Sequence, residues 1–164
     1  MASIDVSLTS PPPATGRREP VTFEVLYERE YVRMVRMAYT LVDTREQAED
    51  VAQDAFAAVY ERFHRLDRPG AYLRVAVLNG CRRVLRRRML SRRHPIPPGE
   101  DGQLGASHVV DAIRRLPHLQ RSMVALRYHL QLTDREIADT LDIPVGTVKS
   151  TIHRALAELR KELS

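Results

Sequence analysis

The chain has 164 residues, a net charge of +5 at pH 7 and a pI near 9.8, and 43% of its residues are hydrophobic. This composition is ordinary for a soluble globular protein of one domain or two small ones. A single cysteine, Cys81, excludes an internal disulfide and any zinc site built from several cysteines. No apolar run approaches the roughly 20 residues of a membrane span, and the N-terminus lacks the apolar core of a signal peptide. We therefore expect a cytoplasmic chain without membrane insertion.

Residues 1–20 are rich in Ser, Thr and Pro, and this composition predicts a disordered leader. Apolar residues then recur at the spacing of one face of a helix. We expect this first helix to begin after Thr22 and to end before the stretch VDTRE at residues 42–46. Its apolar face consists of Tyr27, Tyr31, Met34, Ala38 and Leu41.

A second helix is predicted from about Arg45 to Phe63, with an apolar face and an opposite face that is acidic. The acidic face is unexpected in a basic chain, although taken alone it is also typical of a solvated helix surface. It contains Glu46, Glu49, Asp50, Gln53 and Asp54, and the apolar face contains Ala48, Val51, Ala52, Ala55, Val59 and Phe63.

The stretch HRLDRPG at residues 64–70 is predicted to be a loop, because Pro69 and Gly70 interrupt helices. A third helix follows from about Ala71 to Arg88. Its first half is apolar nearly all round, which predicts that it is buried, whereas its second half is basic.

The Arg-rich stretch of residues 79–93, which includes the basic part of the third helix, contains seven arginines and no acid. Cations are favourable near a helix C-terminus, but this effect explains only a few of them. Such a face neutralises phosphates, so it indicates contact with nucleic acid. A membrane-surface role is disfavoured because large apolar residues do not flank the arginines. The residues that share one face are Asn79, Arg83, Arg86 and Arg87.

Residues 91–107 contain three prolines and three glycines, and this composition predicts a flexible linker. No stretch of the chain alternates with period two for long enough to indicate a sheet. We therefore predict an all-α fold of two small helical domains, residues 21–90 and 108–164, joined by the linker. The helical segments predicted after the linker are 108–116, 118–130, 133–141 and 145–163.

The last part of the chain has the features of a helix-turn-helix. Thr133 and Glu136 form the Thr-x-x-Glu pattern of a capping box before a short apolar run. Asp142-Ile143-Pro144 is a tight turn, and Pro144 stands where a new helix can begin. Two helices joined in this way place the second helix in the DNA major groove, with its early residues toward the base edges.

The second helix of this motif has a continuous polar face away from its apolar stripe. Lys and Arg can contact guanine edges or phosphates, and Ser and His can donate hydrogen bonds to either. An ordinary helical hairpin with a solvated face would also show polar residues here. The capping box, the turn and the polar face in series favour DNA reading. The outer residues are Thr147, Lys149, Ser150, His153 and Arg154.

No catalytic constellation is evident in the sequence. The six histidines show no paired ligand spacing, and no Gly-rich phosphate loop or nucleophile elbow is present. We therefore expect no enzymatic activity, no cofactor and no metal, and a nuclease or phosphodiesterase is disfavoured. Cys81 is expected to be a small buried residue.

Three stretches in the same order resemble signatures of the small sigma factors of bacterial RNA polymerase, the extracytoplasmic-function (ECF) type of the sigma-70 family. AEDVAQDAF is similar to the acidic signature D-L-V-Q-E-x-F, and RPGAYLRVAVLNG is similar to P-x-A-W-L-x-x-I-A-x-N. The stretch from LPHLQRSM to STIHRAL is similar to the pattern that ends in G-T-V-K-S-x-x-x-R-A. The resemblance covers about residues 21–163 and implies the two domains called sigma-2 and sigma-4.

The resemblance implies that the chain binds core RNA polymerase and directs promoter recognition and transcription initiation. The sigma-2 helix at residues 45–63 would dock on the clamp helices of the beta-prime subunit, and the beta flap and an anti-sigma factor are further expected partners. The residues at the docking positions are Glu49, Asp50, Gln53 and Asp54.

Promoter DNA is the other implied partner. The loop at residues 64–70 and the third helix would melt and bind the minus 10 element, through Tyr72, Asn79, Arg83, Arg86 and Arg87. The helix-turn-helix would read the minus 35 element in duplex DNA, through Thr147, Lys149, Ser150, His153 and Arg154.

Two departures from the family pattern and two other functions need to be considered. Tyr72 stands where the family has Trp, and Asp142 stands where it has Gly, although Asp tolerates a left-handed backbone better than most residues.

A free-standing DNA-binding regulator would have no use for the acidic face at residues 46–54, and an RNA-binding protein would need more stacking aromatics. Because DNA repels an acidic face, this one indicates a protein partner.

Overall fold

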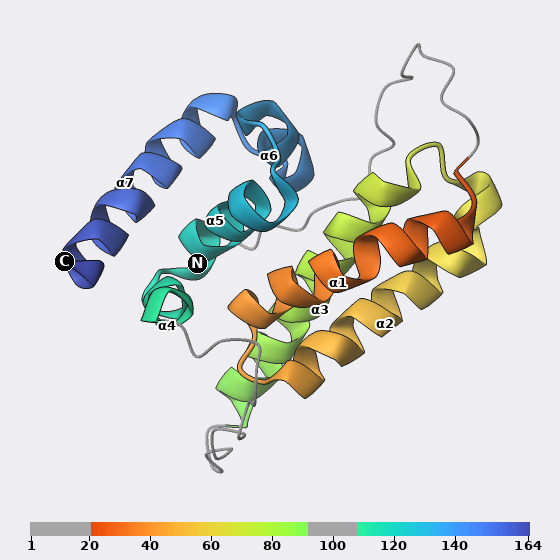
Figure 1. The fold of residues 1–164 in the computed structure, drawn as a ribbon, viewed down its shortest axis with the longest axis horizontal. Coiled ribbons are helices and arrows are strands. Elements are labelled where there is room, and N and C mark those ends of the chain that lie inside the picture. Colours follow the sequence, from red (N-terminus) through yellow and green to blue (C-terminus); the bar gives the residue numbers. More distant parts are fainter. Residues whose placement is uncertain (1–20, 92–107) are drawn as a thin grey trace.

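A computed structural model describes residues 21–91 and 108–164, and it confirms the all-α prediction for these residues. The predicted leader at 1–20 and nearly all of the predicted linker lie outside the described residues. The helices are α1 Phe23–Leu41, α2 Arg45–Arg62, α3 Pro69–Leu90, α4 His108–Arg115, α5 His118–Leu130, α6 Asp134–Leu141 and α7 Val145–Leu163 (Figure 1). A short 3₁₀ turn, η1, at Phe63–Arg65 follows α2.

Three helices begin at a threonine whose side chain accepts a hydrogen bond from the first turn, as polar caps commonly do. Thr22 caps α1, Thr44 caps α2 and Thr133 caps α6. At Thr44 the box is closed by Gln47, whose Oε1 accepts from the Thr44 N–H at 3.3 Å. The α3 helix has Pro69 in its first turn, where the missing N–H costs nothing.

The first half of the chain, α1 to α3, is a bundle of three helices that lie side by side in Figure 1. The side chains of Met34, Leu41 and Leu73 are fully buried between them. Gly80 of α3 lies close to the Val51 side chain of α2, because a Cβ added to Gly80 would lie 2.7 Å from Cγ1 of Val51. This contact joins the acidic helix to the basic one.

The second half, α4 to α7, is built around α5. Met123, Leu126, Ile137 and Val148 are fully buried in it. The α6 and α7 helices meet at the turn of residues 142–144, as the helix-turn-helix prediction required.

The two halves are in contact along α1. The α5 helix packs on α1, α6 touches α3, and α4 touches the end of α1. One continuous cluster of buried apolar side chains includes members from both halves. None of the described helices is long and apolar enough to cross a membrane.

Candidate functional site

The helix-turn-helix has the predicted local structure. The Thr133 Oγ1 accepts from the Glu136 N–H at 3.2 Å, and Glu136 Oε2 accepts from the Thr133 N–H at 2.8 Å. The Thr133 hydroxyl also donates to Glu136 Oε2 at 2.8 Å, and the two hydrogen bonds that the carboxylate accepts from Thr133 lower the pKa of Glu136 below its ordinary value. Asp142 has φ 53° and ψ 53°, in the left-handed region, and its N–H donates to Ala138, so it serves in the place that glycine has in the family pattern.

The α7 helix presents the predicted DNA-reading residues to solvent. Val148, Ile152 and Ala155 are buried on its inner face. Gly146 has no neighbouring atom within 4 Å of an added Cβ, so nothing inside the protein requires a glycine there. The exposed residues are Thr147, Lys149, Ser150, His153 and Arg154, all on the outer side of the first turns.

The α3 helix brings its predicted residues onto one face along its length, as a rotation of 100° per residue requires. Tyr72 and Asn79 are half-buried near the apolar part, and Arg83, Arg86 and Arg87 are exposed toward the C-terminal end. Arg88 lies off this face, and its Nη1 donates to Asp43 Oδ1 at 2.7 Å.

The acidic face of α2 points away from the core. Asp50, Gln53 and Asp54 are exposed, whereas Val51 and Ala55, on the inner side of the same helix, are buried. Glu49 differs from them, because its carboxylate accepts from Arg45 Nε at 2.7 Å within the same helix. The charge at Glu49 is therefore partly neutralised, and the part of the face that has no ion pair with another described residue is centred on Asp50 and Asp54.

Cys81 is fully buried beside Gly80 in α3, as predicted, and burial raises the pKa of its thiol to about 12. A thiol with this pKa is protonated and unreactive at neutral pH. In the part of the chain that the structure describes, no three His, Cys, Asp or Glu side chains gather so that they could hold a metal ion.

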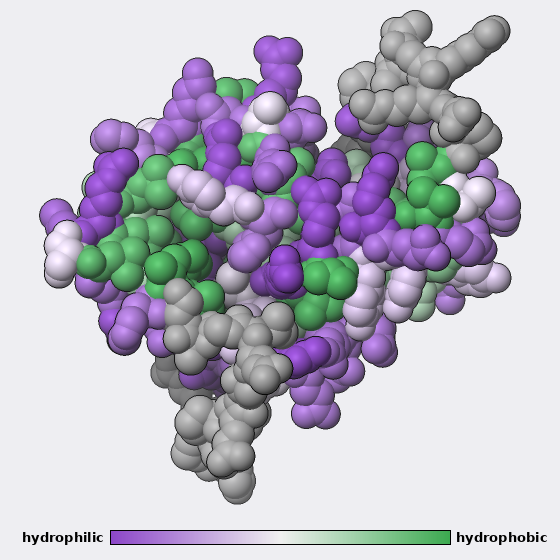
Figure 2. Space-filling model, in the orientation of Figure 1, coloured by the Kyte–Doolittle hydropathy of each residue, from purple (hydrophilic) through white to green (hydrophobic). Residues whose placement is uncertain are grey.

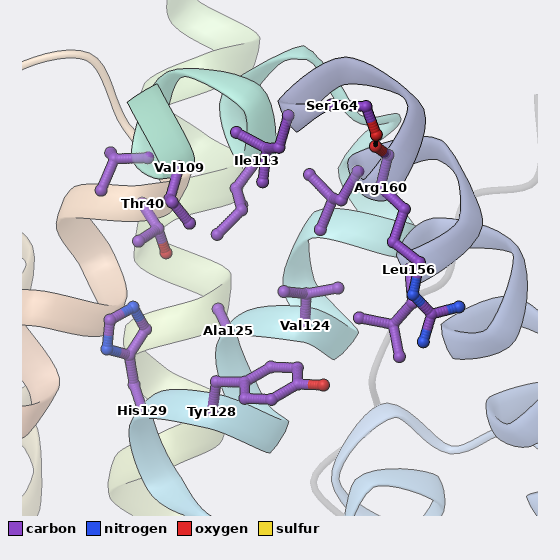
Figure 3. A pocket seen from close by; sticks show the side chains of 13 residues that line it. Thr40, Val109, Ile113, Val124, Ala125, Tyr128, His129, Leu156, Arg160 and Ser164 are labelled. Atoms are coloured by element: carbon purple, nitrogen blue, oxygen red, sulfur yellow. Dashed lines mark hydrogen bonds between the residues drawn. The ribbon is translucent and has the colours of Figure 1, made fainter. Parts of the chain in front are cut away.

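An apolar cavity of about 730 Å³ lies between α4, α5 and α7, with Thr40 of α1 at one side (Figure 3). Its walls include Ile113, Val124 and Leu156, and Arg160 lies at its edge. Val109, Tyr128 and Leu163 are exposed around it. Hydrophobic side chains also gather over this half of the molecule in Figure 2, on a face that is otherwise mostly hydrophilic.

Two arginines join the halves of the molecule, and no pattern in the sequence indicated either contact. Arg33 Nη2 of α1 donates to the Leu130 carbonyl at 3.1 Å, and Arg114 Nη2 of α4 donates to the Tyr39 carbonyl at 2.8 Å. The Arg114 guanidinium also lies 4.3 Å from the centre of the Tyr39 ring. These partners are 97 and 75 residues apart, so helical periodicity could not predict them.

Comparisons with known proteins match both halves. Residues 26–90 match the family model described as Sigma-70 region 2, and residues 108–159 match Sigma-70, region 4. The RNA polymerase sigma-E factor of Streptomyces coelicolor is 35% identical, over 85% of this chain and 88% of that protein. The ECF RNA polymerase sigma factor RpoE of Cereibacter sphaeroides is 31% identical, over 72% of this chain and 73% of that protein.

Two solved structures are similar in fold. One is the sigma factor RpoE in complex with the anti-sigma factor NepR from Bartonella quintana, with a TM-score of 0.72 and 21% identity over 86% of this chain and 96% of that one. The other is CnrH in complex with the cytosolic domain of CnrY, with a TM-score of 0.67 and 25% identity over 86% of both chains.

Proposed function

The chain belongs to the sigma-70 family of RNA polymerase sigma factors, in its ECF type, and on that premise we propose how its residues divide the work. As a sigma factor it binds core RNA polymerase and directs promoter recognition and transcription initiation. Members of this family are transcription initiation factors, and neither of the two family models that match describes an enzyme. We propose that residues 21–90 act as the sigma-2 domain and residues 108–164 as the sigma-4 domain.

The α2 helix docks on the clamp helices of the beta-prime subunit in this proposal. Asp50, Gln53 and Asp54 are exposed on a helix whose other side is locked in the core, so the face is presented rigidly. An acidic face is repelled by DNA and attracted by a basic protein surface. Glu49 contributes less in this proposal, because Arg45 partly neutralises its charge.

The α3 helix and the turn before it bind the minus 10 element. Tyr72 and Asn79 stand in the half-buried part of the face, where an unstacked base can be held, and Arg83, Arg86 and Arg87 follow the strand's phosphates. Extruding a base costs a few kcal/mol, which contacts to the base and to the backbone must offset. The order along the helix therefore separates base capture from phosphate neutralisation.

The α7 helix reads the minus 35 element in the major groove. The capping box and the left-handed Asp142 set the angle between α6 and α7, so the outer face of α7 is free to enter the groove. Lys149 and Arg154 supply the cations of this face, and Thr147, Ser150 and His153 supply further hydrogen-bonding groups.

The apolar cavity beside α7 receives the polymerase beta flap. Exposed Val109, Tyr128 and Leu163 surround an apolar space large enough for several side chains of a partner helix. Val109→Asp on the exposed edge is expected to reduce minus 35-dependent transcription and to leave binding of the chain through α2 intact. A Val25→Asp variant, exposed on α1, is the matched control.

We further propose that the protein works in the cytoplasm and is held inactive by an anti-sigma factor. The solved sigma factors similar in fold are each described as bound to an anti-sigma factor or to the cytosolic domain of a partner. That likeness supports an inhibitory partner for this chain and does not identify it.

The separation of an exposed acidic face on α2 from an exposed DNA-reading face on α7 is the observation that supports this division of work most strongly. Run-off transcription with core polymerase and a set of candidate promoters tests it. Core polymerase with this protein is expected to bind and transcribe promoters that core alone ignores. The proposal fails if addition of the protein gives no promoter an advantage.

A further inference from the structure

The cavity between α4, α5 and α7 has the size and the lining of a site for one apolar chain. Its volume of about 730 Å³ lies within the range of about 300–1,000 Å³ that small-molecule sites in proteins have. Val124 and Leu159 are buried in its wall, and Ile113 and Leu156 are half-buried there. Apolar walls of this kind favour a ligand whose larger part is hydrocarbon, because binding removes that part from water.

The wall beside α1 carries polar groups that add no charge. The Thr40 hydroxyl is buried and donates to the Met37 carbonyl at 2.7 Å. His129 is half-buried, and burial together with the cation Arg36 lowers the pKa of its ring below the ordinary value. The ring is therefore neutral at pH 7, and this end of the cavity suits the tail of a ligand rather than its head group.

The other side of the cavity carries a cation. Figure 3 shows the guanidinium of Arg160 and the hydroxyl of Tyr128 on the side away from Thr40. Arg160 is exposed and forms no ion pair with another described residue. A guanidinium donates two parallel hydrogen bonds to a carboxylate, and a phenol hydroxyl can donate another. These two groups can therefore hold the carboxylate of a ligand whose tail lies in the cavity.

A single-chain acid fits this site better than the surface of a membrane does. Among the described residues that line the cavity, Arg160 is the one arginine or lysine. Attraction to an anionic lipid surface takes a cluster of several basic residues. One cation beside one apolar space matches a ligand that has one negative group and one chain.

We propose that the cavity binds a free fatty acid, with the hydrocarbon tail between α4, α5 and α7 and the carboxylate on Arg160 and Tyr128. The site is a property of the chain alone. Its consequence for transcription rests on the proposed function, in which the same cavity receives the beta flap. Because the fatty acid and the flap need the same apolar space, the fatty acid reduces minus 35-dependent transcription.

Calorimetric titration of the free protein with fatty acids, kept below their micelle concentrations, measures the binding. Each added methylene is expected to tighten binding about fourfold, so dodecanoate should bind about 15-fold more tightly than decanoate. Dodecyltrimethylammonium has the same tail and the opposite charge, and it should bind roughly tenfold more weakly than dodecanoate. Equal affinity for the two head groups, or no gain with chain length, would overturn the proposal.

Arg160→Gln tests the contact with the head group. It is expected to weaken dodecanoate binding about fivefold and to strengthen the binding of dodecyltrimethylammonium, because the cation at the mouth is gone. The matched control is Lys161→Gln, which removes the neighbouring exposed cation outside the lining and should bind dodecanoate as the parent does. An equal loss in both variants would show general charge attraction and overturn the assignment of Arg160.

Ile113→Trp tests the position of the tail. The larger side chain takes up part of the cavity, so it should weaken the binding of dodecanoate more than that of octanoate. Circular dichroism verifies that the variant keeps its helices. Unchanged selectivity for chain length in the folded variant would place the tail elsewhere and overturn the site.

Sedimentation with phosphatidylglycerol vesicles distinguishes a free fatty acid from a membrane surface. The parent protein is expected to stay in the supernatant, because its cavity offers one cation and room for one chain. Sedimentation with the vesicles, without binding of dodecanoate in the titration, would assign this face to a membrane and overturn the proposal.

Run-off transcription from a minus 35-dependent promoter measures the consequence. Dodecanoate is expected to inhibit the parent, and the Arg160→Gln variant should need about fivefold more of it for half-inhibition of its own level. Half-inhibition of both at the same concentration would overturn competition at the cavity. If the parent directs no promoter-dependent transcription, the proposed function fails, while the titration of the free protein still decides whether the site exists.

Discussion

In the α1–α3 half, two polar faces of opposite charge lie on neighbouring helices, with the acids on α2 and the arginines on α3. The α4–α7 half has one basic face, on α7, beside an apolar cavity. The contact between Gly80 and Val51 lies between these two helices. In the proposed function, the first half binds a protein and a nucleic acid at once, whereas the second half separates a polar DNA contact from an apolar protein contact.

The largest expected effect is the loss of polymerase binding when the acidic face is reversed. Asp50→Arg together with Asp54→Arg is expected to abolish core binding, measured by co-migration with core polymerase, because a basic surface would then face the clamp helices. Thermal unfolding should be nearly unchanged, since both side chains are exposed. The control Glu24→Arg, Glu28→Arg makes the same charge change on exposed positions of α1. Equal core affinity in both double variants would contradict the docking assignment.

The second effect concerns the basic face of the other half. Lys149→Ala together with Arg154→Ala is expected to weaken minus 35-dependent promoter binding at least tenfold, since each good base contact contributes about 1–3 kcal/mol. Core binding should be retained. Promoter binding of the complete polymerase complex, measured at several salt concentrations, should also show a shallower salt dependence wherever a phosphate contact is lost. An equal loss in the exposed Lys161→Ala variant would show that only general charge matters.

The third effect compares one glycine from each half. Gly80→Ala should lower the free energy of unfolding by about 1–2 kcal/mol, because the added Cβ would lie 2.7 Å from the stiff side chain of Val51. Gly146→Ala meets no neighbour and should raise it, by up to about 1 kcal/mol, through helix propensity. Denaturant titration of both variants measures the difference. Val51→Ala should relieve part of the Gly80→Ala defect, and a defect that persists unchanged would contradict the steric explanation.

Much of this structure could be predicted from local patterns. Periodicity located the helices, and the spacing Thr133 to Glu136 gave the capping box that sets α6. Asp142 was correctly expected to tolerate the left-handed turn. The roles of the outer residues of α2, α3 and α7 remain predictions, because exposure alone does not identify what they bind.

The features that the sequence did not predict join residues that lie far apart along the chain. Two hydrogen bonds between the halves join Arg33 to Leu130 and Arg114 to Tyr39, and nothing near any of these residues marks them as partners. The cavity forms only when helices from separate segments meet, with Thr40 of α1 beside α4, α5 and α7. Glu49 looked equivalent to Asp50 in the acidic face, although its ion pair with Arg45 follows the ordinary i, i+4 rule and could have been anticipated.

The smallest expected effect concerns His118 and depends on pH. Burial, together with the cations Arg121 and Arg82, lowers the pKa of His118 to about 4 from an ordinary value near 6.5. Between these two pH values His118 binds a proton in the unfolded chain but not in the folded chain. The free energy of unfolding therefore falls as the pH drops from about 6.5 to 4. Because the ring keeps some contact with solvent, we expect a loss of about 1–2 kcal/mol rather than the full shift.

His118→Gln should remove this part of the pH dependence, because glutamine keeps a polar group at this position without taking up a proton. Denaturant titrations at pH 7 and pH 5 measure it as the difference between variant and parent, which cancels the contribution of the carboxylates. His64→Gln, exposed in η1, is the control and should follow the parent. If the parent and His118→Gln lose stability equally on acidification, His118 is not the group that makes the fold sensitive to acid.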